Sequence, residues 1–261
     1  MKIMHNHAHR TESASTAIAW AFFLNLGFTL VEFVGGWLTN STAIMADAVH
    51  DLGDSLSIGL AWFLGNVSRK GATENFTYGF QRFSLLGALV NGVVLVSGSI
   101  WVLSEAIPRL WSPEMPDAQG MVLLAVFGVA VNGFAAYKLS RGKSLNERIL
   151  NWHLLEDVFG WAAVLIIAVL LTFFEWPILD PILSIGFTLF ILINVVKNLA
   201  ETVRIFLQAS PDSNMRKSIL EELSSIPGIQ AVHHLFIWSL DGENHVLTVH
   251  LLLEDNSDIA A

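Results

Sequence analysis

An acidic cluster that includes one histidine lies inside an apolar stretch of the chain. Three aspartates and one histidine fall within eight residues, namely Asp47, His50, Asp51 and Asp54. In a helix, residues three, four or seven positions apart share one face, so Asp47, His50 and Asp54 would lie together. Asp51, four residues after Asp47, borders that face. His50 and Asp54, one turn apart, can offer a nitrogen and an oxygen to one metal ion.

The same spacing of possible ligands occurs once more. His153 and Asp157 are also four residues apart, at the start of another apolar run, and the sequence has no further His-x-x-x-Asp pair. Zinc takes four ligands in a tetrahedron, and a chain without cysteine must supply them from His, Asp or Glu. Two such pairs on facing helices would provide two nitrogens and two oxygens. The alternative is that these residues only make polar contacts between helices; the repeated spacing favours ligands.

The element that carries the first pair must turn its acidic face away from lipid. Residues 42–67 are long enough to cross a bilayer. Three ionised aspartates at mid-membrane would cost about 7–10 kcal/mol, whereas the eight most apolar side chains of the stretch return about 2.5–5 kcal/mol. The helix must therefore direct its aspartates toward protein, water or a bound cation.

The composition indicates a membrane protein with several spans. Hydrophobic residues make up 53% of the 261 residues, charged residues only 14%, and the mean hydropathy is +0.56. Ordinary soluble domains have about 25% charged residues. A formal charge of −9 argues against a nucleic-acid partner. We therefore expect the lipid bilayer, and no nucleic acid, among the partners of the chain.

The expected fold is an all-α membrane protein with six transmembrane helices, followed by a small α/β domain. The six apolar stretches cover residues 17–38, 42–67, 83–107, 120–139, 149–174 and 177–207. An even number of spans places both termini on one side. Thirteen of the fourteen Lys and Arg residues fall at or near that side and only Arg109 at the other, so both termini are expected in the cytoplasm.

The composition changes after residue 209. A helix is expected over residues 215–225, and two strands over 231–240 and 245–253, joined by an Asp-Gly-containing hairpin. We therefore predict two domains, a transmembrane transport domain (residues 1–209) and a cytoplasmic α-β-β domain (residues 210–261). A domain of about fifty residues is only marginally stable unless it packs against another domain or chain.

Several motifs together resemble the cation diffusion facilitator family of the zinc-transporting type. Residues 40–50 together with Asp54 resemble the second span of that family. The run Thr-Tyr-Gly-Phe-Gln-Arg at residues 77–82 and the third span after it are similar to the family pattern, as are residues 153–157 in the fifth span. Asp180 and Pro181 match the start of the sixth span. Without the resemblance, Asp180-Pro181 reads as a helix N-cap followed by proline.

The resemblance implies a homodimeric transporter that exchanges a divalent metal for protons. It carries over His50, Asp54, His153 and Asp157 as the transport-site ligands. It also implies a metallochaperone-like cytoplasmic domain, whose second helix and last strand are not found in this sequence, so the domain is expected to be incomplete. His233 and His250 fall where relatives carry cytoplasmic metal ligands. Because His233 and His234 would point to opposite faces of a regular strand, at most one should join His250.

The function expected from these observations is zinc efflux by proton antiport, at the inner membrane if the source is bacterial. Zinc is the transported substrate, cobalt, cadmium or iron(II) are the alternatives, and no organic cofactor is expected. An intramembrane metalloenzyme and a metal sensor are the competing classes, although the His-Glu-x-x-His motif of metalloproteases is missing. Asp47 and Asp51 would support the ligands or line the route to them, unless they only face a water-filled cavity. Asn25 and Glu32 are expected to be packing contacts between helices.

Overall fold

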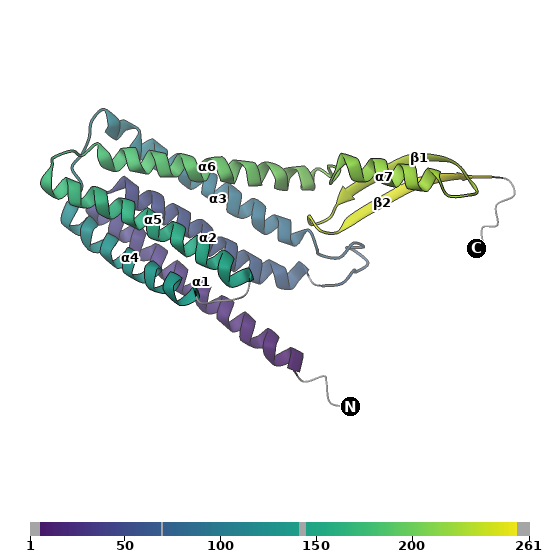
Figure 1. Cartoon of the computed structure of the whole chain (residues 1–261), viewed down its shortest axis with the longest axis horizontal. Coiled ribbons are helices and arrows are strands. Elements are labelled where there is room, and N and C mark those ends of the chain that lie inside the picture. Colours follow the sequence, from purple (N-terminus) through teal and green to yellow (C-terminus); the bar gives the residue numbers. More distant parts are fainter. Residues whose placement is uncertain (1–5, 69, 141–144, 255–261) are drawn as a thin grey trace. The chain divides into compact units, whose positions relative to one another are not determined.

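The computed structural model describes residues 6–68, 70–140 and 145–254. Within them, six long helices precede a short helix and a two-stranded sheet (Figure 1). The helices are α1 (Asn6–Thr39), α2 (Thr42–Ser68), α3 (Phe83–Ala106), the short 3-10 turn η1 (Pro108–Leu110), α4 (Ala118–Leu139), α5 (Leu145–Phe173), α6 (Leu179–Phe206) and α7 (Ser213–Ser224). The strands are β1 (Ile229–Ser239) and β2 (His245–Leu253). The predicted order of elements is confirmed.

Five of the described helices are long and apolar enough to cross a membrane. They contribute the stretches Phe22–Thr39, Phe83–Leu110, Ala118–Lys138, Asn151–Phe173 and Leu179–Phe206. The helix α2 has 27 residues but is not one of these five. Its three aspartates and its histidine lower the average hydropathy of the span, as expected for a helix whose polar face is turned away from lipid.

The predicted element boundaries are close to the observed ones, with two larger differences. α1 begins at Asn6 rather than at residue 17, and α5 begins at Leu145 rather than at residue 149. Hydropathy marks only the apolar part of a helix, whereas the backbone stays helical through preceding polar residues that are adequate helix formers. β2 covers the predicted residues, and β1 begins two residues earlier than predicted.

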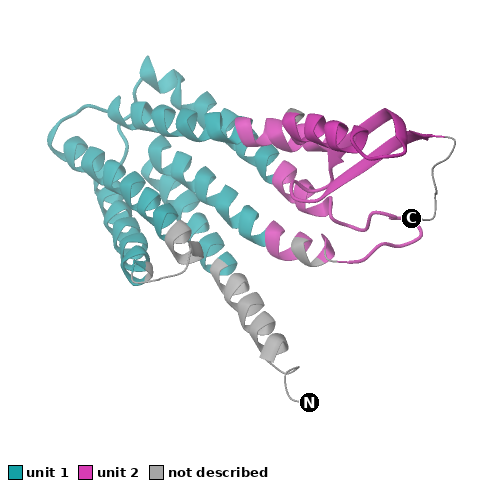
Figure 2. Cartoon of the chain, turned by 45° about the vertical axis from the view of Figure 1, so that its right-hand side comes forward, with its two compact units in different colours: residues 1–59, 91–196 teal, residues 60–90, 197–261 magenta. Residues whose placement is uncertain are grey.

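The chain divides into two compact units (Figure 2). The first comprises residues 1–59 and 91–196, and the second comprises residues 60–90 and 197–261. In the first unit, α2 contributes to two buried clusters. On one side Ala43 and Ile44 pack with α4 and α5, around Trp161. On another side Ala46 and Val49 pack with α3 and α6. This double packing fixes the rotation of α2 about its axis, and with it the direction of the acidic face.

In the second unit, β1 and β2 pair in antiparallel register and α7 packs against β1. Asp212 caps α7 by accepting a hydrogen bond from the N–H of Asn214 at 2.9 Å. Asp241 closes the hairpin, since its Oδ1 accepts hydrogen bonds from the N–H groups of Asn244 (2.7 Å) and Glu243 (3.0 Å). Partial burial raises the pKa of Asp241, but these hydrogen bonds outweigh that effect and hold the pKa below its ordinary value.

Candidate metal-binding site

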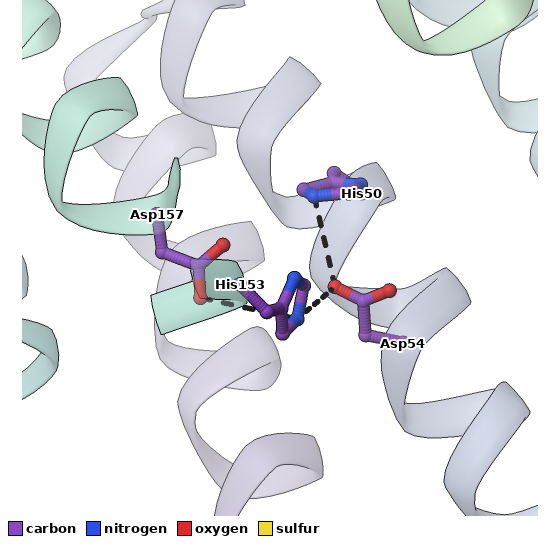
Figure 3. Close-up of side chains that lie close together, drawn as sticks. All are labelled: His50, Asp54, His153 and Asp157. Carbon is purple, nitrogen blue, oxygen red and sulfur yellow. Dashed lines mark ion pairs between the residues drawn. The ribbon is translucent and has the colours of Figure 1, made fainter. Parts of the chain in front are cut away.

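Helices α2 and α5 bring the two His-x-x-x-Asp pairs together (Figure 3). One potential ligand atom from each of His50, Asp54, His153 and Asp157 lies within 4.8 Å of all the others. Nε2 of His153 is 3.1 Å from Oδ2 of Asp54, across the two helices. Within the helices, Nε2 of His50 is 3.6 Å from the same oxygen of Asp54, and Nε2 of His153 is 4.0 Å from Oδ2 of Asp157.

These separations fit a small tetrahedral metal ion. Zinc binds imidazole nitrogen and carboxylate oxygen at about 2.0–2.2 Å, so two ligands of a tetrahedral site lie about 3.3–3.6 Å apart. The three measured separations, 3.1, 3.6 and 4.0 Å, lie around that range. The four atoms lie within 4.8 Å of one another, so the most distant of them would have to approach to form a tetrahedron of two nitrogens and two oxygens. The role of the four residues as metal ligands stays a prediction.

Some of the converging atoms have no hydrogen-bond partner. Nε2 of His50 and Oδ1 of Asp157 are buried and make no hydrogen bond. Phe187 of α6 packs edge-on against the ring of His50, with 5.9 Å between the ring centroids. The four residues therefore combine buried polar atoms that lack hydrogen-bond partners with an apolar ring beside them.

The start of α2 is held by an aspartate from another helix. The carboxylate of Asp180, in the first turn of α6, accepts hydrogen bonds from the N–H and hydroxyl of Thr42, at 2.7 and 2.8 Å. It also accepts from the hydroxyl of Ser41 and from the N–H of Ala43 (3.3 Å). Ser184 adds a hydrogen bond from its hydroxyl to the carbonyl of Thr42, at 2.9 Å. Asp180 is 1% exposed, so these bonds are shielded from water.

This contact corrects the simple interpretation of Asp180-Pro181 as the cap of its own helix. Asp180 instead caps the N-terminus of α2, where free backbone N–H groups and the positive end of the helix dipole favour a carboxylate. The hydrogen bonds to Asp180 fix how far α2 extends along its own axis relative to α6. They therefore position His50 and Asp54, two to three turns further along α2.

Two acidic residues that were expected to support the site lie in different surroundings. Asp47 and His153 both line a cavity of about 690 Å³ between α2, α5 and α6, together with Gly160 and Phe187. Asp47 is 3% exposed and its Oδ2 has no hydrogen-bond partner. Asp51 is also buried but is not among the residues that line this cavity. A role along the route to the metal site therefore fits Asp47 better than Asp51.

The cytoplasmic histidines are arranged differently from the regular strand that was assumed. His233 lies opposite His250 in the register of β1 and β2, but an irregularity of the pairing follows directly after His233. His234 has a φ of +51°, and its ring centroid is 5.1 Å from that of His250. An extra residue in one strand disturbs the strict alternation of faces. The expectation that only one neighbour could join His250, and that it would be His233, therefore rested on a regular pleat that β1 does not have.

The chain matches two families of known proteins along most of its length. Residues 18–207 match the cation efflux transmembrane domain, and residues 211–261 match the cation efflux protein cytoplasmic domain. The match over residues 18–207 includes α2, so its acidic residues lie within a membrane domain. These families consist of transporters, not enzymes.

Curated relatives point to the same family. The "cadmium, cobalt and zinc/H(+)-K(+) antiporter" of Bacillus velezensis is 30% identical over 260 residues, which is 98% of this chain and 83% of the relative. The "zinc transporter ZitB" of Escherichia coli K12 is 32% identical over 259 residues, or 95% and 82% of the two chains. The "metal cation efflux system protein CzcD" of Cupriavidus metallidurans is 29% identical over 250 residues, or 95% and 79%. The chain therefore belongs to the cation efflux, or cation diffusion facilitator, family of membrane transporters.

Proposed function

We propose that this transporter exports zinc by exchanging it for protons at the site formed by His50, Asp54, His153 and Asp157. The observation that carries the proposal is the convergence of four ligand atoms, two from each of α2 and α5, within 4.8 Å. Nothing in either helix alone would hold an ion, because each supplies only half of a tetrahedron.

The ligand set supports zinc as the main substrate. Imidazole nitrogens combined with carboxylate oxygens suit zinc, whereas sites made only of oxygen ligands favour magnesium, calcium or manganese. Cobalt(II), cadmium and iron(II) can occupy the same kind of site and are alternative substrates. The names of the relatives include zinc, cadmium and cobalt, and so support these three metals as substrates.

Proton exchange follows from the chemistry of the same four residues. Metal binding needs neutral imidazole and ionised carboxylate, so protons and metal compete for the ligand atoms. A site open to a more acidic solution takes up protons and releases zinc, and a site open to a neutral solution does the reverse. The name of the Bacillus velezensis relative, cadmium, cobalt and zinc/H(+)-K(+) antiporter, supports a proton-coupled cycle.

The orientation and assembly of the chain are part of the proposal. Both termini lie in the cytoplasm, as the distribution of Lys and Arg indicates, and in a bacterium the protein lies in the inner membrane. The family matches to residues 18–207 and 211–261 support our proposal of a transport domain over residues 1–209 and a cytoplasmic domain over residues 210–261.

A homodimer could shield the apolar side chains of the small sheet from water. A hairpin of two strands is marginally stable by itself, and this one exposes apolar side chains on both strands, including Phe236, Leu247 and Leu252. A second metal position at His233 and His250 would further tie β1 to β2. The pairing of these two residues in the register of the sheet supports it.

Transport by sealed proteoliposomes that contain the purified protein tests the proposed function. Zinc entering the vesicles is followed with an internal fluorescent chelator, for the wild type and for Asp157→Ala. Glu175→Gln is the control, since Glu175 is an exposed acid just after α5 that is not one of the four ligands and does not line the 690 Å³ cavity. We expect uptake by the wild type and the control and none by Asp157→Ala. Full uptake by Asp157→Ala would refute the four-ligand site, and zinc-dependent transcription or proteolysis without uptake would favour a sensor or an enzyme.

A further inference from the structure

One buried carboxyl group in the first unit has no role in the site described above. Glu32, in the membrane-spanning part of α1, is 1% exposed, and neither Oε1 nor Oε2 has a hydrogen-bond partner. It is the only buried glutamate among the described residues. An ionised carboxylate in such surroundings is costly unless a cation, a hydrogen-bond donor or a proton neutralises it.

Glu32 belongs to a polar face that α1 presents to α2. Asn25, Thr29 and Glu32 are four and then three residues apart, so they lie on one face of α1. The amide of Asn25 donates a hydrogen bond to Oγ of Ser55 at 3.0 Å, and the hydroxyl of Thr29 lies 3.5 Å from the same oxygen. Thr29 and Ser55 are 0% and 1% exposed. The contact between the two helices is therefore polar and closed to solvent at this level.

Among the described residues, the charged groups that act on Glu32 are acidic. They are Asp51 and Asp47 on α2 and Asp157 on α5. Neither oxygen of Glu32 accepts a hydrogen bond, so no donor in the described part of the chain stabilises its ionised form. Like charges sharing a buried site also disfavour ionisation of both.

We propose that Glu32 is a second proton-binding position of the transporter, distinct from the metal ligands, which holds a proton while the metal site is empty and releases it when zinc binds. The inference rests on the proposed function, because it adds one more proton to the exchange cycle. The reaction is a simple acid dissociation, in which the O–H bond of the carboxyl breaks and the proton passes to water. No electron transfer and no further reactant are involved.

The link between Glu32 and the metal site is electrostatic. Asp157, one of the four predicted ligands, acts on Glu32, so a change of charge at the metal site is felt there. A divalent cation beside Asp157 offsets the negative charge that disfavours an ionised Glu32. Asp47, another of the acids that act on Glu32, lines the 690 Å³ cavity, so the route that we propose for the released proton runs through this cavity.

The number of protons released on zinc binding tests the proposal. Isothermal titration of the purified protein with zinc, in buffers that differ in ionisation enthalpy, yields this number for the wild type, for Glu32→Gln and for Thr29→Val. The glutamine keeps the shape of the protonated carboxyl but has no proton to lose. We expect Glu32→Gln to bind zinc and to release about one proton fewer per ion than the wild type, while Thr29→Val, on the same face of α1, releases the wild-type number.

An unchanged proton count in Glu32→Gln with zinc binding intact would overturn the inference and leave the proposed function standing. A wild-type protein that binds no zinc would instead refute the proposed function. If Glu32→Gln does not fold, infrared difference spectra of the wild type can test instead whether zinc binding removes a proton from a glutamate. Addition of zinc should remove a protonated-carboxyl band that shifts when the glutamates carry 13C-labelled carboxyl groups. If no protonated-carboxyl band is lost on addition of zinc, the proposal is contradicted. The same holds if the lost band has the same position with and without the 13C label on the glutamates.

Discussion

Nε2 of His153 lies closer to Oδ2 of Asp54, on the opposite helix, than to Oδ2 of Asp157 on its own helix, at 3.1 Å against 4.0 Å. The shortest link in the site is therefore a contact between α2 and α5. The site consequently depends on how these two helices are held together, and not only on the four residues. Contacts that fix the position of α2 or the packing of α5 should affect metal binding from a distance.

The charge of Asp54, and not only its shape, should be needed for zinc binding. Asp54→Asn keeps the size of the side chain but replaces an anionic ligand by a neutral amide. Residues that only support metal ligands typically change affinity by 10–100-fold, so loss of this ligand should lower zinc affinity by more than about 100-fold. Competition with a fluorescent chelator measures the affinity. Near-wild-type affinity of Asp54→Asn would mean that Asp54 only holds the helices together.

Removal of the cross-helix cap at Asp180 should destabilise the protein. Asp180→Ala leaves the N–H groups of Thr42 and Ala43 and two hydroxyls without their acceptor. Each unsatisfied buried group costs about 1–3 kcal/mol, although nearby water can satisfy some of them. We expect a clearly lower melting temperature and weaker zinc binding, both partly restored in Asp180→Asn, which keeps one acceptor oxygen. Thermal unfolding in detergent, with and without zinc, checks this.

A melting temperature of Asp180→Ala equal to that of the wild type would show that α2 does not depend on this cap. Weaker zinc binding without any loss of stability would assign Asp180 a direct effect on the metal site instead.

Close packing of α4 against α5 should be sensitive to a single methyl group. A Cβ atom at Gly128 would lie 2.3 Å from Cδ2 of Trp161, a side chain that is 1% exposed. Gly128→Ala should therefore cost about 1–3 kcal/mol of stability, since the buried indole has no room to move away. Gly186→Ala, in α6, is the control because no atom lies within 4 Å of its added methyl group. Equal melting temperatures for both variants would contradict this prediction.

Much of the arrangement could be predicted because it depends on local periodicity. The spacing of His50 with Asp54 and of His153 with Asp157 places each pair on one helical face, and the energetics of burial require that face to point inward. Hydropathy located the helices, and the Asp-Gly hairpin located the strands. These features need no knowledge of which helices touch.

Other features depend on contacts between distant parts of the chain and could not be predicted. The cap of α2 comes from Asp180, 138 residues after Thr42, and no local pattern indicates that pairing. The burial of Glu32 without a hydrogen-bond partner could not be predicted either, because a single acid in an apolar helix does not indicate what lies around it. The ring contact of His234 with His250 could not be predicted, because strand alternation assumes a regular pleat, whereas β1 is irregular at that point.

Metal selectivity should follow the ligand at position 50. His50→Asp replaces a nitrogen by an oxygen ligand and adds a negative charge, so the preference should shift from zinc toward harder or larger ions such as manganese or cadmium. Competition binding of zinc, cobalt, cadmium, manganese and iron(II) to the wild type and the variant measures the shift. His153→Asp is the matched variant on α5. An unchanged order of preference in His50→Asp would place selectivity in other residues.

Zinc flux should depend on a pH gradient across the membrane. Metal binding requires the imidazoles of His50 and His153 to be neutral and the carboxylates of Asp54 and Asp157 to be ionised, so each zinc ion displaces protons. Free imidazole titrates near pH 6.5, between the pH values that commonly occur on the two faces of a membrane. A gradient that is acidic on the release side therefore favours protonation and zinc release there. On the other side, the more alkaline solution removes the protons and allows zinc to bind.

Proteoliposomes with a fixed zinc gradient and a variable pH gradient separate this coupling from passive flow. Zinc uptake should rise as the vesicle interior is made more acidic than the medium, and a protonophore or nigericin should abolish that increase. Acidification of both sides together should instead slow uptake, since protons then compete with zinc at the binding step. A site that merely conducts zinc down its gradient would carry equal flux with and without the pH difference, and a uniporter or channel would then describe the protein better.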